Sequence, residues 1–313
     1  MGYFDIQVNG YAGVDFNQDD LSAEELHRGC EHLRDDGVDG ILATIITETE
    51  ERMIRRIRRI VELRKTGELA QSIIAGIHIE GPFLNPNAGY RGAHPLDAIR
   101  PADLGFASRL LEAAEGLARI FTLAPEQDPG CELIRMLVQR GVTVSAGHTD
   151  ASLPQLEEAI DAGLSMATHL GNGCPALLPR HDNIIQRILY LRDHLWIGFI
   201  ADGVHIPFPT LRNYLDLIGP EGKCLVTTDA MAAAGLGPGR YRLGRWTVDV
   251  GDDLAARSPD GSHLIGSAIS MPRAAENLAN HAGMDATAIH RLTNVHPRQS
   301  LRQPSPPPLV PCL

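Results

Sequence analysis

Short, nearly continuous apolar runs recur along the chain, separated by amphipathic stretches. Eight such runs lie at residues 3–8, 40–47, 73–80, 118–125, 141–148, 164–170, 195–202 and 223–230. Uninterrupted apolar runs are typical of parallel strands that are buried on both faces. Apolar residues at helical spacing occur between them, at 22–36, 50–65, 131–140 and 153–162. Alternating strands and helices indicate βαβ units, and eight of them predict an α/β fold of the (β/α)8 TIM-type barrel.

An open, doubly wound sheet is the main alternative to the barrel. Such a sheet usually shows a glycine-rich phosphate turn after an early strand, and this sequence has none. We therefore expect one barrel domain over residues 1–301. A long insert at about 235–268 is predicted to contain a hairpin, and the proline-rich tail at 302–313 is expected to be extended or disordered.

Composition narrows the possible partners of this protein. The chain has 313 residues, a net charge of −11 and a sequence pI of about 5.6, which argues against a nucleic-acid surface or an acidic membrane surface. The basic segment 52–65 has apolar residues at helical spacing, so we interpret it as a barrel-packing helix with a solvated basic face. Five scattered cysteines, with no leader-like or membrane-spanning segment, predict a cytoplasmic protein with free thiols.

Polar residues stand where the predicted strands end. In a barrel, the carboxyl ends of the strands meet at one rim, where catalytic residues lie. Glu80 ends the third strand, His148 the fifth and His169 the sixth. His205 follows the seventh strand, and Asp229 ends the eighth. A strand-end histidine is more often a hydrogen-bonded structural residue, and an aspartate there can cap a helix. Five such residues at one rim are harder to explain separately.

This combination of side chains is typical of a catalytic metal site. Two imidazoles and a carboxylate provide three protein ligands and leave a position for water. Zinc is the first expectation, although other divalent metals suit the same ligands. A further carboxylate next to the bound water can act as a general base.

Several motifs around these residues resemble those of N-acetylglucosamine-6-phosphate deacetylases in the amidohydrolase superfamily. They are "GIHIEGPFLNPNAGYRGAHP", "VSAGHTDAS", "ATHLGNGCPA", "FIADGVHI" and "LVTTDAMAAAGLGPGRYRLG", with "LIGSAISM" at 264–271. The resemblance extends from Phe4 to about Leu301. It implies metal-dependent hydrolysis of the acetamide of an N-acetyl amino sugar phosphate.

The resemblance also implies a role for each matching residue. Glu80, His148 and His169 match the metal ligands, Asp229 the residue that activates water and protonates the leaving amine, and His205 the histidine that polarises the amide carbonyl. Substrate-contacting positions are matched by His94, Asn172, Gly173 and Arg180. In the family, the arginine at the Arg180 position reaches the phosphate of the neighbouring subunit's substrate, which implies a homodimer. On the first strand, Gln7 and Asn9 replace a His-x-His pair, so one metal ion is expected.

Some features depart from the family pattern. Typical members have a small β-sandwich domain before and after the barrel, and the segments that form it are not evident in this sequence. Gly171, Gly173 and Cys174 replace the usual aromatic residue, alanine and methionine, and "HDN" follows Arg180 instead of "EPG". These changes line the expected sugar pocket and concern the substrate more than the chemistry.

Three functions remain open from the sequence. The first is deacetylation of N-acetylglucosamine 6-phosphate or a close N-acetyl amino sugar phosphate. The second keeps the metal site but acts on an unphosphorylated N-acyl substrate, and Arg180 distinguishes the two because a phosphate needs a cationic partner. The third is an inactive barrel with a binding role.

Overall fold

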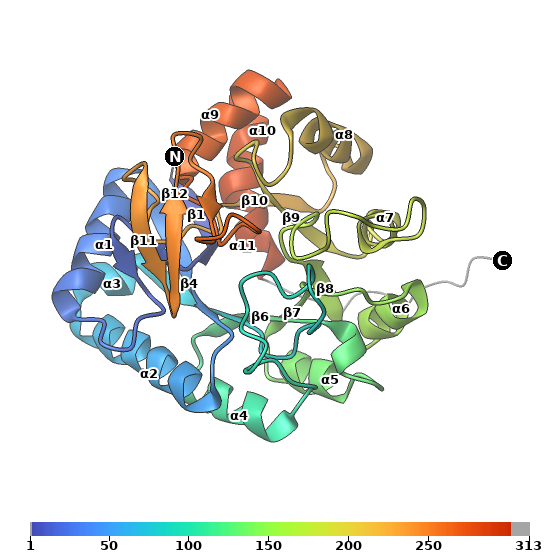
Figure 1. Ribbon diagram of the computed structural model, residues 1–313, viewed down its shortest axis with the longest axis horizontal. Helices are drawn as coiled ribbons and strands as arrows, with labels where there is room; N and C mark the ends of the chain where they lie inside the picture. Colours follow the sequence, from blue (N-terminus) through green and yellow to red (C-terminus); the bar gives the residue numbers. More distant parts are fainter. Residues whose placement is uncertain (1, 302–313) are drawn as a thin grey trace.

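Eight parallel strands form the centre of the protein, and helices surround them (Figure 1). The computed structural model describes residues 2–301, so the predicted tail at 302–313 lies outside the described residues. In sheet order, the strands are β1 (Tyr3–Val8), β4 (Val38–Ile46), β5 (Ile74–Glu80), β6 (Ala118–Leu123), β7 (Thr143–Ala146), β8 (Leu164–Ala167), β9 (Trp196–Ile200) and β10 (Cys224–Thr227). All eight overlap the predicted runs, and the (β/α)8 barrel is confirmed.

The sheet closes between its first and last strands. Val8 forms a parallel bridge with Ala230, and the backbone N–H of Asn9 donates to the Ala230 carbonyl at 2.7 Å. This closure brings the end of β1 next to the segment that follows β10. β1 and β10 are far apart in the sequence, but side chains at their ends therefore reach the same rim.

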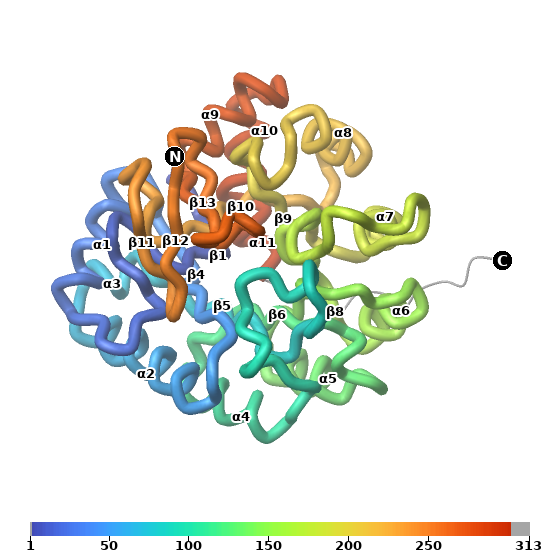
Figure 2. Tube along the Cα trace, in the orientation of Figure 1, coloured from blue at the N-terminus to red at the C-terminus, as the bar shows by residue number. Residues whose placement is uncertain are grey.

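Helices follow most strands and cover the outside of the barrel (Figures 1 and 2). They are α1 (Ala23–Asp35), α2 (Glu50–Thr66), α3 (Glu68–Ile73), α4 (Leu104–Ala113), α5 (Glu132–Gln139), α6 (Leu153–Asp161), α7 (Ile184–Tyr190), α8 (Phe208–Ile218), α9 (Met271–Ala282), α10 (Ala286–His290) and α11 (His296–Ser300). A 3-10 turn (Pro125–Gln127) and a π-helical turn (Arg291–Val295) complete them. The helix α1 begins at a capping box in which Ser22 and Glu25 satisfy each other's backbone amides.

The predicted solvated basic face of α2 is only partly correct. Apolar residues of this helix pack on the barrel, as the spacing predicted. Arg56, however, has only 3% of its surface exposed, because it lies beneath the hairpin region instead of facing solvent. Local spacing could not show this, since the covering residues belong to a segment far along the chain.

The predicted insert contains a small antiparallel sheet. Its strands are β11 (Gly239–Leu243), β12 (Trp246–Val250) and β13 (Ala256–Arg257), so a hairpin is present within 235–268. The sheet has its own apolar cluster, which includes Leu243 and Val248 and reaches Ile46 of β4. A two-stranded ribbon, β2 (Gly10–Tyr11) and β3 (Val14–Asp15), follows β1.

The interior of the barrel changes from apolar to polar along its axis. One apolar cluster combines Phe4 and Ile6 of β1 with one residue each from β4, β6, β8 and β10, namely Leu42, Ile120, Met166 and Leu225. Because side chains alternate along a strand, the residues two positions beyond Ile120 and Met166 face the same interior, and these are Thr122 and Thr168. Their hydroxyls lie 2.8 Å apart, and His78 contacts Thr122 at 2.7 Å. A hydrogen-bonded polar layer therefore supports the rim.

Candidate active site

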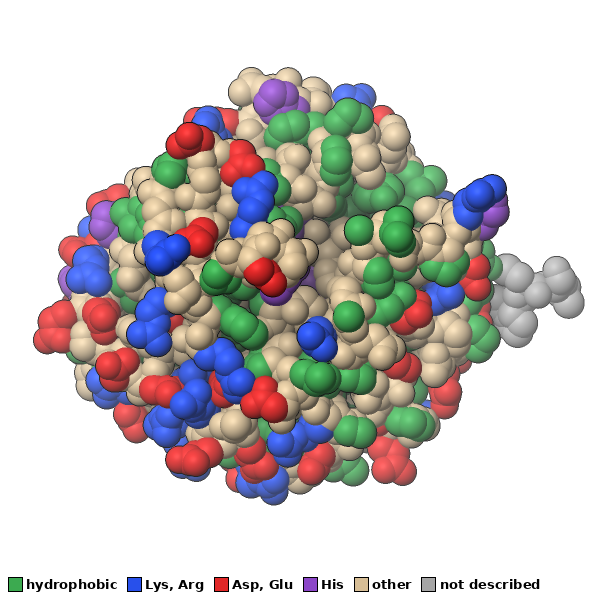
Figure 3. All heavy atoms as spheres, viewed as in Figure 1, with side chains coloured by type: hydrophobic (Ala, Val, Ile, Leu, Met, Phe, Trp, Pro, Cys, Tyr) green, Lys and Arg blue, Asp and Glu red, His purple; other side chains and the backbone are tan. Residues whose placement is uncertain are grey.

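A cavity of about 800 Å³ opens at the carboxyl ends of the strands. Figure 3 shows its mouth near the centre of one face, with histidine side chains inside it. All the predicted site residues except Arg180 line this cavity: Glu80, His94, His148, His169, Asn172, Gly173, His205 and Asp229. The structure therefore brings together side chains from five different strand ends, as the barrel geometry predicted.

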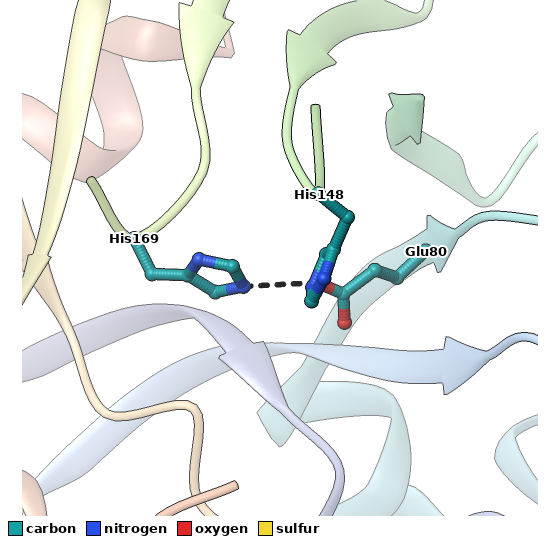
Figure 4. Close-up of side chains that lie close together, drawn as sticks. All are labelled: Glu80, His148 and His169. Atoms are coloured by element: carbon teal, nitrogen blue, oxygen red, sulfur yellow. Dashed lines mark hydrogen bonds and ion pairs between the residues drawn. The ribbon is translucent and has the colours of Figure 1, made fainter. Parts of the chain in front are cut away.

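Glu80, His148 and His169 converge inside the cavity (Figure 4). Glu80 Oε1 lies 3.1 Å from His169 Nε2 and 3.3 Å from His148 Nε2. The three potential ligand atoms all lie within 4.8 Å of one another, and all three residues are buried. This carboxylate and imidazole set suits a divalent metal such as zinc. The cluster also explains why a buried strand ends on a carboxylate.

Neighbouring groups fix the orientation of these three side chains. His148 Nδ1 donates to the Tyr90 carbonyl at 2.7 Å, which leaves Nε2 free to act as a ligand. The Gln7 amide donates to both carboxylate oxygens of Glu80, at 3.2 Å each. His94 lies at the edge, with its Nε2 3.2 Å from His148 Nε2. Gln7, which replaces a histidine of the family's first strand, is therefore in direct contact with the cluster of Glu80, His148 and His169.

The electrostatics of the cluster also suit a cation. Burial favours the protonated form of Glu80, but hydrogen bonds from His148 and His169 hold its pKa well below the usual range. Burial likewise opposes a charge on His169, yet the hydrogen bond to Glu80 raises the pKa of that imidazole. The buried carboxylate thus attracts positive charge to the position where the three ligand atoms meet.

Asp229 faces the same cavity from the end of β10. Its Oδ1 accepts a hydrogen bond of 2.7 Å from Asn9 Nδ2. Desolvation by the surrounding protein, followed by the negative charge of Glu80, raises the pKa of Asp229 to about 6. A carboxyl group with a pKa near neutrality can accept and then release a proton, which is what general acid–base catalysis requires.

His205 is held by a carboxylate that sequence reasoning did not single out. Its Nδ1 donates to Asp202 Oδ2 at 2.5 Å, and both side chains are nearly buried. Burial opposes ionisation of Asp202, but the hydrogen bond from His205 lowers its pKa overall. The second ring nitrogen of His205 is thereby left for contact with a ligand in the cavity. The spacing "DGVH" held this signal, since an aspartate three positions earlier can reach the imidazole.

Three site residues have a left-handed backbone. The φ angles of His148, His169 and Asp229 are +52°, +30° and +52°. Few residues other than glycine adopt this region, and strain of about 1–3 kcal/mol per residue is found mainly where a function requires it. Each residue follows the end of its strand, so the turn there directs the side chain into the cavity.

Gly173 contacts the His148 ring closely. Its φ is +60°, and a Cβ atom added there would lie 2.6 Å from His148 Nδ1. Glycine at this position, where the resembling family usually has alanine, is therefore required by the packing in this chain. Asn172 is anchored next to it through its own amide, which donates to the His169 carbonyl at 3.0 Å.

The arginine that lines the cavity is not the one matched by the family resemblance. Arg180 is exposed on the loop before α7 and does not line the cavity of this chain. Arg91 does line it, and it is the one arginine or lysine to do so among residues 2–301. Asp260, Ser262 and His263, from the segment after β13, close another side. Sequence reasoning missed these four residues because loops, not strand ends, place them there.

The chain matches known proteins over most of its length. Residues 2–234 match the Amidohydrolase family. The chain is 33% identical to N-acetylglucosamine-6-phosphate deacetylase of Bos taurus, over 96% of this chain and 73% of that protein. It is 30% identical to N-acetylgalactosamine-6-phosphate deacetylase of Escherichia coli O157:H7, over 96% of this chain and 77% of that protein.

A solved structure gives the same result. The N-acetyl-D-glucosamine-6-phosphate deacetylase of Mycobacterium smegmatis, solved as a point mutant in complex with N-acetyl-D-glucosamine-6-phosphate, superposes with a TM-score of 0.86. The two chains are 31% identical, and the match covers 97% of this chain and 78% of that one. The chain therefore belongs to the amidohydrolase family and, within it, to the N-acetylglucosamine-6-phosphate deacetylase family.

Proposed function

We propose that this protein hydrolyses the acetamide of N-acetylglucosamine 6-phosphate, or of a close N-acetyl amino sugar phosphate, to the amino sugar phosphate and acetate. One observation carries the proposal: three sets of groups face one cavity. They are the potential metal ligands Glu80, His148 and His169, the Asp229 carboxyl group with its raised pKa, and His205 held by Asp202. Amide hydrolysis needs activated water, a stabilised oxyanion and a proton for the leaving amine. The related deacetylases support the same substrate class.

Members of the amidohydrolase family depend on metal, and Glu80, His148 and His169 would hold one ion here. We propose zinc, because two imidazoles and one carboxylate with an open position are typical of catalytic zinc. When bound, the metal lowers the pKa of water and polarises the amide carbonyl. Gln7 and Asn9 occupy the positions where a second pair of histidines would stand, which supports one ion per chain.

The protein's own groups manage the protons and the developing charge. The Asp229 carboxylate takes a proton from water as the oxygen attacks the carbonyl carbon. The same carboxyl group then gives this proton to the amine nitrogen as the carbon–nitrogen bond breaks. His205 donates to the carbonyl oxygen, and Asp202 holds the imidazole in the orientation for that contact.

Phosphate recognition distinguishes this function from its main alternative. His94, Asn172 and Gly173 line the cavity as candidates for sugar contacts. Arg91 supplies positive charge within the chain, whereas the exposed Arg180 would have to reach a neighbouring subunit's cavity. We therefore propose a homodimer with Arg180 acting across it. The scarcity of cations around the cavity is the observation that keeps an unphosphorylated N-acyl substrate as the second candidate.

The test is acetate release from N-acetylglucosamine, N-acetylgalactosamine and N-acetylmannosamine, each with and without a 6-phosphate. Metal content and sedimentation are measured on the same preparation. Wild-type protein should prefer a phosphorylated sugar, and Arg91→Gln and Arg180→Gln should reduce that preference mainly through KM. Activity with no preference for phosphate would favour the second candidate. An absence of acetate release from metal-loaded protein would favour the inactive barrel.

Within residues 2–301, no helix is long and apolar enough to cross a lipid bilayer. Four of the five cysteines lie in the described part, and all four are free thiols. A reducing compartment suits free thiols, which supports our proposal that the protein works in the cytoplasm.

A further inference from the structure

A second cavity lies away from the active site, between α2 and the β11–β12 hairpin. Its volume is about 620 Å³. Figure 3 shows basic side chains, in blue, gathered beside that hairpin, in a protein whose net charge is −11. Five guanidinium groups line the cavity, two from β11 and its turn and three from α2: Arg242, Arg245, Arg52, Arg55 and Arg56.

The arginines of this cluster have more donors than the chain has acceptors for them. The Arg56 side chain is 3% exposed; its Nε donates to Asp19 Oδ1 at 2.8 Å, but its Nη1 is buried without a hydrogen-bond partner among residues 2–301. Asp19 also pairs with Arg55 at 3.0 Å and with Arg52 at 3.5 Å, so this carboxylate is shared by three guanidinium groups. Arg52 and Arg55 each have one further ion pair, with Glu48 at 3.6 Å and with Glu51 at 3.5 Å. A guanidinium has five N–H donors, and a buried one left unpaired is costly.

Arg242 and Arg245 contribute differently. Glu48 and Asp97 bind the Arg245 guanidinium, with 3.0 Å between Arg245 Nη1 and Asp97 Oδ1, so this side chain forms a fixed wall. The Arg242 side chain is exposed and forms no hydrogen bond or ion pair of its own among residues 2–301, although its charge acts on the buried Asp15 carboxyl group. It therefore has donors available for an anion, and the mostly buried Arg56 guanidinium lines the same cavity.

We propose that this cavity is a second anion site that binds a phosphate group, through Arg55, Arg56 and Arg242. A phosphate oxyanion offers several acceptors to the planar forks of these arginines, which is the geometry that guanidinium groups bind best. The volume is large enough for a phosphorylated small molecule. The source is a sugar phosphate or a nucleotide, which share this group.

The site is placed so that an anion would affect the active-site wall. Leu243 lines the catalytic cavity, whereas its neighbours Arg242 and Gly244 line the anion cavity. The backbone amide of Gly244 is already held by Asp15 at 2.7 Å. A phosphate that joins Arg242 to α2 would therefore restrain the same turn that carries Leu243 into the active site.

Hydrogen–deuterium exchange of the metal-loaded protein tests the proposal with inorganic phosphate as the probe and chloride at equal ionic strength as the reference. No turnover is involved, so the result is independent of the proposed deacetylation. Phosphate should slow exchange in peptides covering 239–250 and 50–56. Binding to the catalytic cavity would instead appear in peptides covering 80–94 and 171–180.

The variants separate this site from general charge effects. Arg242→Gln and Arg55→Gln should each raise the phosphate concentration for half-maximal protection about tenfold or more, as expected when one charge-assisted hydrogen bond is lost. Arg58→Gln is the matched control, because Arg58 is exposed on the same helix but does not line the cavity. Both test positions are exposed, so if one variant misfolds the other still decides the question.

Glucosamine 6-phosphate and adenosine 5′-monophosphate identify the source of the phosphate. Tighter protection by one of them than by inorganic phosphate assigns the site to that class, and equal protection assigns it to the phosphate group alone. The proposal is overturned if phosphate leaves residues 239–250 unprotected, or if Arg242→Gln and Arg55→Gln are protected like the wild type.

Discussion

Replacing Asn9 with leucine tests how the site sets the proton affinity of its general base. Asn9 is 1% exposed, and its Nδ2 donates to Asp229 Oδ1 at 2.7 Å. Leucine has a similar size, so Asn9→Leu removes the donor without leaving a large hole. The buried Asn9 Oδ1 has no hydrogen-bond partner among residues 2–301, so its loss removes no bond within them.

The expected effect can be worked out from that one contact. A hydrogen bond to a charged group contributes about 1.5–3 kcal/mol, and a shift of one pKa unit corresponds to about 1.4 kcal/mol. The bond stabilises the ionised form of Asp229, so its loss should raise the pKa of Asp229 by about one to two units. Asp229 must be ionised to accept a proton from water, and activity is therefore lost as pH falls through this pKa.

The assay is the pH dependence of kcat/KM for acetate release at saturating zinc. In Asn9→Leu, the acid limb of the profile should move to higher pH by about one to two units, with a plateau at alkaline pH close to that of the wild type. Gln7→Met is the comparison variant, because Gln7 lies two residues before Asn9 and donates to Glu80 but not to Asp229. An acid limb that stays in place in Asn9→Leu would refute the role given to this hydrogen bond.

Three further substitutions test the remaining parts of the site. Asp229→Asn should lower kcat by about two to four decades and leave the metal bound; near-normal turnover would exclude Asp229 as the general acid–base. His148→Ala should lose both metal and activity, and full metal content by elemental analysis would contradict its role as a ligand. Gly173→Ala should destabilise the protein by about 1 kcal/mol or more in thermal unfolding and should lower metal retention. The reason is that the added Cβ would meet the His148 ring. Unchanged stability and metal content would show that this contact can relax.

Barrel geometry explains why part of the site could be predicted. The ends of parallel barrel strands must lie at one rim, so Glu80, His148 and Asp229 could be expected together from the sequence. Asp202 could also have been predicted, because it lies three residues before His205; the structure shows that the two side chains are hydrogen-bonded. Arg91 and His263 could not, because each depends on the course of a loop.

The apolar runs determined a parallel sheet buried on both faces, and the number of runs, with no glycine-rich phosphate turn among them, favoured a barrel over an open sheet. The polar residues that interrupt that pattern determined the rim chemistry. Only the tertiary structure decided that Asn9 contacts Asp229, that Gly173 packs on His148, and that the hairpin covers Arg56. Those contacts join segments that are distant along the chain, and their geometry depends on barrel closure and loop paths. Local periodicity carries no information about either.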